Sequence, residues 1–180
     1  MARHILITGA RGAGKSTLVK RLLQESRRPL AGFVTRRLEP DESGFHPIYI
    51  HPAADNALTV SEQNLIGTCN SRKHLTNPDV FNTLGVQYLQ AGPHSLIVMD
   101  ELGFMEAKAA QFCSAVLRAL DGDVPVIAVV KARDDIAFLN QLRAHPNADV
   151  FTLTAENRES LFHTLQPRIH GWNDELRWAE

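Results

Sequence analysis

The feature that constrains this chain most is a glycine-rich stretch that joins a short apolar run to an amphipathic segment. Residues 4–8 are rich in β-branched side chains and predict a buried strand, whereas apolar residues recur at helical spacing over residues 17–23. Between them the sequence matches the pattern GxxxxGK[ST], with the residues Gly9, Ala10, Arg11, Gly12, Ala13, Gly14, Lys15, Ser16 and Thr17. Strand, motif and helix in this order predict a phosphate-binding loop, or P-loop.

The residue types of this loop suit phosphate chemistry. Gly9, Gly12 and Gly14 allow backbone conformations that a Cβ would obstruct, so that successive N–H groups can point at phosphate oxygens. Lys15 is expected to reach the β- and γ-phosphates, and the Ser16 hydroxyl is expected to ligate the Mg²⁺ that bridges them. A glycine-rich turn without a ligand is the alternative, and the complete pattern in its strand–helix setting argues against it. The stretch therefore predicts binding of a nucleoside triphosphate or its diphosphate.

Length, charge and cysteine content narrow the class of protein. At 180 residues the chain suits a single domain over residues 1–180, and its formal net charge of −1 gives no overall attraction to nucleic acid or an anionic membrane. Cys69 and Cys113 form no metal-binding spacing, and the longest apolar run, residues 124–130, is too short to span a bilayer. No apolar stretch of signal-peptide length precedes the P-loop. We expect a cytoplasmic protein; its oligomeric state stays open, with a monomer as the working expectation.

Two strand-like segments and a long polar stretch follow the first helix. Residues 31–35 and 45–51 flank a turn rich in Glu, Pro, Asp, Ser and Gly, and together they predict a β-hairpin. His46 and His51 alternate with apolar residues there and are expected to face solvent. Residues 52–76 are polar with weak periodicity, which predicts a flexible loop of the kind that often forms a lid or binding segment.

Strands and helices alternate in the remainder of the chain. Helical patterns start at Asn77, after Gly103 and at about Asp134, and a final one covers residues 156–165. The strands between them are apolar throughout and cover residues 95–101, 124–130 and 149–154. Such strands indicate a parallel sheet that is buried on both faces. We therefore predict an α/β fold, a three-layer α/β/α sandwich of the P-loop type with a mainly parallel sheet and a small β-hairpin insertion.

The strand over residues 95–101 ends in two acids, Asp100 and Glu101. Ligands of parallel sheets bind beyond the carboxyl ends of the strands, which brings this pair to the P-loop. Asp100 is expected to hold Mg²⁺, directly or through a water opposite Ser16, as a Walker B aspartate does. Glu101 suits a general base that activates the attacking water. Without the P-loop, the pair would be interpreted as the polar end of a buried strand. Glu106, a third acid nearby, is expected to interact with the dipole of the next helix from its first turn.

Phosphoryl transfer also needs positive charge on the transferring group, and an arginine often supplies it. The sequence does not choose among its candidates, each of which could also be solvated surface: Arg11, Arg36, Arg37, Arg72, Arg133 and Arg158.

Four stretches resemble one family, the small P-loop nucleoside-triphosphatases that include a thermophile phosphohydrolase and a human cancer-related enzyme. They are residues 1–18, the GFVT of residues 32–35 with the Gly-Phe of residues 44–45, MDELGFME over residues 99–106, and VFTLTAENRESL over residues 150–161. The P-loop is widespread, but the other motifs together are much more specific. The resemblance covers almost the whole chain, and it implies Mg²⁺-dependent hydrolysis of ATP, GTP and other triphosphates to the diphosphate and phosphate.

Three features depart from that family. Phe104 stands where the family usually has lysine, Arg36 and Arg37 replace a typically acidic pair, and the segment before the Asn77 helix is short and poorly matched. Nucleotide binding is expected to survive these changes, whereas rate and base preference depend on them. By position, Asn157 and Arg158 lie where P-loop folds commonly place a base-contacting loop, with helix capping as the alternative role.

Two other functions compete with hydrolysis. A P-loop kinase shares this core and could use residues 52–76 as an acceptor pocket or lid, although only scattered arginines are available for such a lid. A slow nucleotide-dependent switch would use hydrolysis only to reset its loops, and the presence of Glu101 argues against it. Binding of ATP or GTP, or of ADP or GDP, is common to all three, so phosphate release without an acceptor separates them.

Overall fold

The structure is a computed structural model that describes residues 3–176. Residues 1–2 and 177–180, which the sequence assigns to the same domain and which include the first residues of the family-like opening, lie outside the described part. One eight-stranded sheet contains β1 (His4–Thr8), β2 (Leu30–Arg37), β3 (His46–Pro52), β4 (Leu65–Cys69), β5 (His74–Thr76), β6 (Leu96–Leu102), β7 (Val126–Val130) and β8 (Ala148–Thr152). The helices are α1 (Lys15–Gln24), α2 (Pro78–Val80), α3 (Val86–Tyr88), α4 (Ala110–Asp121), α5 (Ala137–Arg143) and α6 (Arg158–Glu175).

The sheet has a parallel half and an antiparallel half, in the order β5-β4-β3-β2-β6-β7-β1-β8. Strands β2, β6, β7, β1 and β8 run parallel, and β3, β4 and β5 extend the sheet beyond β2 as antiparallel strands. The predicted fold class and the β2–β3 hairpin are therefore confirmed. The expectation of a loop over residues 52–76 was wrong, because this segment supplies β4 and β5 and continues the hairpin into a larger antiparallel extension.

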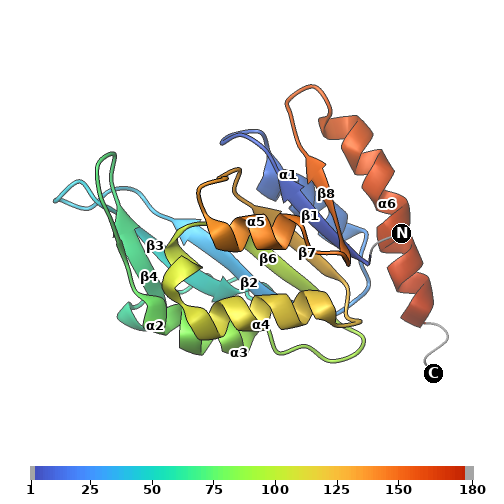
Figure 1. Ribbon diagram of the computed structural model, residues 1–180, viewed down its shortest axis with the longest axis horizontal. Helices are drawn as coiled ribbons and strands as arrows, with labels where there is room; N and C mark the ends of the chain where they lie inside the picture. Colours follow the sequence, from blue (N-terminus) through green and yellow to red (C-terminus); the bar gives the residue numbers. More distant parts are fainter. Residues whose placement is uncertain (1–2, 177–180) are drawn as a thin grey trace.

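Two hydrophobic clusters lie on opposite faces of the sheet, because successive side chains of a strand point to opposite faces. On β1, Leu6 joins the cluster covered by α4 and α5, whereas Ile5 and Ile7 join the cluster covered by α1 and α6. Burial of one such side chain contributes roughly 1.5–3 kcal/mol. Figure 1 shows α4 and α5 lying across one side of the sheet. With α1 and α6 packed against the opposite face, the fold has three layers.

Three local predictions differ from the structure. Helix α6 continues to Glu175 through Pro167, ten residues beyond the predicted end, because Ile169 and Trp172 gain burial against the second cluster. Helix α5 begins at Ala137 rather than near residue 134. His51 is 1% exposed and does not face solvent as expected, and burial lowers the pKa of its imidazole.

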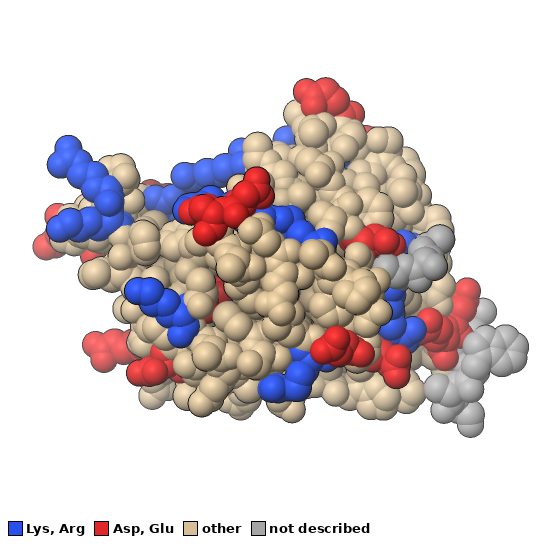
Figure 2. All heavy atoms as spheres, viewed as in Figure 1, with Lys and Arg blue, Asp and Glu red and all other residues tan. Residues whose placement is uncertain are grey.

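Charged residues of both signs are interspersed over the face shown in Figure 2. This distribution agrees with the net charge of −1. Among the described helices, none combines the length and the apolar character that crossing a membrane requires.

Candidate active site

The P-loop occupies the turn between β1 and α1, and its glycines have conformations that fit this role. Gly9 has a φ of 140°, and a Cβ on it would collide with the carbonyl oxygen of Leu153, which follows β8. Gly14 precedes α1 with a φ of 100°, a left-handed conformation that other residues adopt only at a cost. The ammonium group of Lys15 lies over the loop and donates hydrogen bonds to the carbonyl oxygens of Gly9 and Ala10, both at 2.9 Å.

The turn between β8 and α6 closes over the same loop. Arg158 donates from Nε to the carbonyl oxygen of Ala13 at 2.7 Å and from Nη2 to that of Gly12 at 3.3 Å. Asn157 holds the turn itself: its Oδ1 accepts from the Thr154 N–H at 2.8 Å, and its Nδ2 donates to the Thr152 carbonyl at 2.9 Å. The structure therefore brings Arg158 to the P-loop and uses the Asn157 side chain within the turn.

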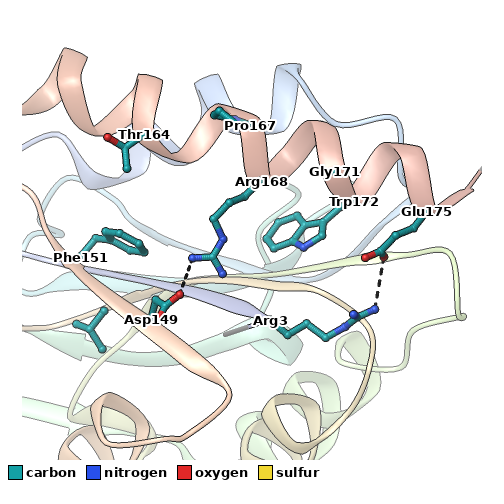
Figure 3. A pocket seen from close by; sticks show the side chains of 10 residues that line it. Arg3, Asp149, Phe151, Thr164, Pro167, Arg168, Gly171, Trp172 and Glu175 are labelled. Carbon is teal, nitrogen blue, oxygen red and sulfur yellow. Dashed lines mark hydrogen bonds and ion pairs between the residues drawn. The ribbon is translucent and has the colours of Figure 1, made fainter. Parts of the chain in front are cut away.

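Two cavities lie near α6, and only one adjoins the P-loop. The smaller, about 350 Å³, is lined by Gly12, Gly14, Thr17, Leu18, Arg21, Arg158 and Glu159. The larger, about 860 Å³, lies between β8 and α6 (Figure 3). There Arg168 pairs with Asp149 at 2.9 Å and Arg3 with Glu175 at 3.5 Å. Because the smaller cavity is lined by P-loop residues and the larger one is not, we place the chemistry beside the smaller one.

Ser16 and Asp100 meet at the carboxyl edge of the sheet, although they are far apart in the sequence. The Ser16 hydroxyl donates to Asp100 Oδ1 at 3.1 Å. Burial raises the pKa of Asp100 to about 6, and the neighbouring Glu101 charge acts in the same direction, whereas the Ser16 hydrogen bond and Lys20 and Lys15 oppose it. The start of α1 thus contributes a hydroxyl group, from Ser16, and the end of β6 contributes a carboxylate, from Asp100, at the same point.

Glu101 has partners that the sequence did not reveal. Its Oε1 lies 3.1 Å from Nζ of Lys131, the residue that follows β7. Its backbone N–H donates to the Thr35 hydroxyl at 3.3 Å, and this hydroxyl donates to the Asp100 carbonyl oxygen at 3.3 Å. Thr35 therefore ties β2 to the backbone of the acidic pair. Only its place in the GFVT motif could have drawn attention to Thr35. The alternation of strands and helices already predicts that Lys131 lies at the same edge of the sheet, but it does not pair Lys131 with Glu101.

Glu106 has a different setting from the one expected. It is 3% exposed, and its Oε1 accepts a hydrogen bond from the backbone N–H of Gly103. Burial raises the pKa of its carboxyl group to about 7, and the bond from Gly103 opposes that rise. Glu106 does lie in the first turn of a short helix, Met105–Lys108, as predicted, but its side chain is buried and closes the turn directly after the acidic pair.

The remaining arginine candidates are spread around the site. Arg11 is an exposed residue of the P-loop, Arg36 and Arg37 are exposed on β2, and Arg72 is exposed in the turn between β4 and β5. Arg133 pairs with Asp135 at 2.5 Å. Of the six candidates, Arg158 is the one with hydrogen bonds to the P-loop backbone among the described residues.

Comparison with known proteins agrees with this geometry. A family model described as NTPase matches residues 4–166. The mouse cancer-related nucleoside-triphosphatase homolog is 32% identical and covers 89% of this chain and 93% of its own length. Nucleoside-triphosphatase THEP1 of Thermotoga maritima is 30% identical, with 89% and 92% covered. The crystal structure of THEP1 from Aquifex aeolicus superposes with a TM-score of 0.64 at 25% identity, over 90% of this chain and 96% of that one. With the P-loop, the acidic pair and the closing turn in the same fold, the chain belongs to the nucleoside-triphosphatase (NTPase) family.

Proposed function

We propose that this protein hydrolyses nucleoside triphosphates, ATP and GTP among them, to the diphosphate and inorganic phosphate in a Mg²⁺-dependent reaction. The observation that carries the proposal is the 3.1 Å hydrogen bond from Ser16 Oγ to Asp100 Oδ1, with Glu101 following in the chain. It joins a P-loop hydroxyl to a strand-end carboxylate, the pair of groups that P-loop enzymes use around the β- and γ-phosphates. Membership of the NTPase family supports the same activity.

The donor set at this point fits Mg²⁺, which prefers oxygen ligands and keeps several waters. Ser16 and Asp100 would hold the ion, directly or through water. Bound Mg²⁺ supplies positive charge against the phosphate oxygens. Within residues 3–176 no group of three or more His, Cys, Asp and Glu side chains converges on one point, so the other ligands would come from phosphates and water.

Lys15 and Glu101 would carry out the remaining steps of the reaction. Lys15, which donates to two P-loop carbonyls, would turn its ammonium group to the β- and γ-phosphate oxygens. A water oxygen attacks the γ-phosphorus, the bond from that phosphorus to the oxygen bridging to the β-phosphate breaks, and Glu101 accepts the proton that the water releases. The products are the nucleoside diphosphate and inorganic phosphate.

Nucleotide binding is assigned to the whole P-loop and to the closing turn. The P-loop residues are Gly9, Ala10, Arg11, Gly12, Ala13, Gly14, Lys15, Ser16 and Thr17. We include Arg158 on the base side because it lines the 350 Å³ cavity beside the loop, and Asn157 because its side chain holds the turn from which Arg158 projects. The Asn157 amide uses both its oxygen and its nitrogen within the turn, which leaves few groups to read a base and supports acceptance of both ATP and GTP.

We extend the proposal to the whole chain. Residues 1–180 would form a single domain that works as a monomer in the cytoplasm, without nucleic acid or membrane as partners. The free thiols of Cys69 and Cys113 fit a reducing compartment.

Phosphate release from Mg-ATP and Mg-GTP by the purified protein, with no acceptor added, tests the activity. We expect steady release that falls roughly 10²- to 10⁴-fold in Glu101→Gln, with nucleotide affinity retained, because the amide cannot accept the proton. Lys15→Ala should lose triphosphate affinity and turnover together. Tight binding with negligible release by the wild-type protein would instead favour a kinase or a switch, and unchanged turnover in Glu101→Gln would dismiss Glu101 as the base.

A further inference from the structure

Lys131 brings the end of β7 into contact with the end of β6. The two strands are parallel neighbours, and the Lys131 backbone N–H donates to the Leu102 carbonyl oxygen at 2.9 Å. From this anchor the side chain reaches Glu101, where Nζ lies 3.1 Å from Oε1. The Lys131 side chain is 38% exposed and the Glu101 side chain 28% exposed, so the pair is only partly open to solvent.

The path of the Lys131 side chain is set by the residues that follow the acidic pair. A Cβ on Gly103 would lie 3.0 Å from Lys131 Cδ, so the aliphatic stem passes close to the glycine backbone. The ring of Phe104 lies with its centroid 5.2 Å from Nζ, within cation–π range. Arg143 donates from Nη1 to the Lys131 carbonyl oxygen at 2.9 Å. Backbone and side chain are thus held on several sides, and the ammonium group has a defined place.

Glu101 needs a fixed cation beside it if its carboxylate is to keep one orientation as a base. It follows Asp100 directly, and two adjacent carboxylates repel each other. A glutamate side chain has three rotatable bonds, and those of Glu101 are not enclosed, since the side chain is 28% exposed. A cation at one oxygen limits this freedom and leaves the other oxygen able to accept a proton from water.

We propose that Lys131 is a positioning residue for Glu101, whose carboxylate it holds by an ion pair at Oε1 toward the attacking water. The inference rests on the proposed role of Glu101 as the base. Lys131 acts through that glutamate and not on the nucleotide, so its loss lowers kcat and leaves the binding of the triphosphate unchanged.

The test compares four further variants with wild type and with Glu101→Gln in the phosphate-release assay, with KM and the dissociation constant of a non-hydrolysable Mg-ATP analogue measured alongside. Lys131→Met removes the charge but keeps much of the stem, Lys131→Arg keeps both charge and reach, and Glu101→Gln/Lys131→Met removes both partners. Lys108→Met is the matched control, because Lys108 is an exposed lysine at the end of the short helix Met105–Lys108, which follows β6. Thermal melting of each variant checks that the fold is intact.

We expect Lys131→Met to lower kcat roughly 10- to 100-fold, as loss of a supporting partner commonly does, with the analogue's dissociation constant within about twofold of wild type. Lys131→Arg should restore most of the rate, Lys108→Met should match wild type, and the double variant should be no slower than Glu101→Gln alone. Unchanged kcat in Lys131→Met, or a kcat in the double variant below that of Glu101→Gln, would overturn this inference but leave the proposed function standing. Weakened analogue binding would overturn it in favour of a direct phosphate contact. Absence of phosphate release by the wild-type protein would overturn the proposed function and the inference together.

Discussion

Glu106 is a buried acid that the proposed chemistry does not use. The residue is 3% exposed, its carboxyl group accepts a hydrogen bond from the Gly103 N–H, and the Cys113 thiol donates to its backbone carbonyl oxygen at 3.3 Å. An ionised carboxylate in such a place costs free energy, which is why burial raises its pKa to about 7. The turn that follows the acidic pair is therefore built on a carboxyl group whose charge depends on pH.

This burial makes stability depend on pH in a definite direction. Between the unfolded pKa of 4.5 and the folded pKa of about 7, the folded protein binds a proton that the unfolded chain has released. The free energy of unfolding therefore falls as pH rises through that window. Glu106→Gln keeps an acceptor oxygen for Gly103 but cannot ionise, so its stability relative to wild type should rise by on the order of 1–3 kcal/mol from pH 4.5 to pH 8. Urea unfolding across this range measures the difference, and parallel profiles for the two proteins would contradict it.

Contacts between residues of local motifs could be predicted from the sequence, whereas pairings that depend on the order of strands in the sheet could not. Ser16 and Asp100 were paired by the P-loop and the acidic strand end, and the structure brings them to 3.1 Å. Lys131 and Thr35 reach the acidic pair only because β7 and β2 flank β6 in the sheet. The sequence predicts that Lys131 lies at the same edge of the sheet as the acidic pair. No spacing along the chain pairs Lys131 with Glu101, or Thr35 with the backbone of the pair, so these contacts required the structure.

At the scale of elements, the antiparallel strands support the segment that follows the acidic pair. Gly67 in β4 has a φ of 156°, and a Cβ there would lie 2.5 Å from the terminal methyl carbon of Met105 and collide with the carbonyl oxygen of Leu75 in β5. His74 of β5 stacks edge-on against Phe104 with ring centroids 4.6 Å apart. Both contacts join β4 and β5 to residues 104–105, a few positions after Glu101.

Gly67→Ala should therefore destabilise the protein by about 2 kcal/mol or more, since the added methyl group meets both backbone and a buried side chain. Gly44→Ala is the matched control: Gly44 also has a positive φ, 77°, but nothing lies within 4 Å of its Cβ position. It should lose only about 1 kcal/mol, the cost of the backbone conformation. Chemical denaturation of both variants measures the difference, and equal losses would show that the contact to β5 and Met105 is unimportant.

Elements with a strong pattern of their own were predictable, and those that depend on tertiary contacts were not. Strands β1, β6 and β7 are buried on both faces and read as apolar runs. In β4 and β5 only Ile66 and Gly67 are buried, so their sequences have no clear period. Helix α6 contains Pro167, which normally argues for a helix end, but Pro167 is exposed and burial of the residues beyond it sustains the helix.

At the scale of the whole molecule, elements from the first and last thirds of the described chain meet at the site, where the start of α6 contacts the P-loop. Helix α6 contacts the P-loop through Arg158. It also contacts the segment between α1 and β2, where Arg28 donates from Nε and Nη2 to the Trp172 carbonyl oxygen at 2.9 and 2.6 Å. Arg28 is also paired with Glu175 at 2.9 Å. The site thus draws on β1, β6, β7 and β8, which are neighbours in the centre and at one edge of the sheet.

Because the site is distributed in this way, a bound nucleotide should stabilise the whole fold and not one loop. A ligand at 100 times its dissociation constant adds about 2.7 kcal/mol to the free energy of unfolding. For a chain of this length that corresponds to a rise in Tm of roughly 5–10 °C. We expect Mg-ADP to produce such a shift in calorimetry as a single sharpened transition, and EDTA to reduce it, since Ser16 and Asp100 would lose their shared ion. Lys15→Ala should show little shift at the same concentration. A shift that persists in Lys15→Ala would place the nucleotide elsewhere, and a split transition would mean that α6 and the P-loop do not unfold together.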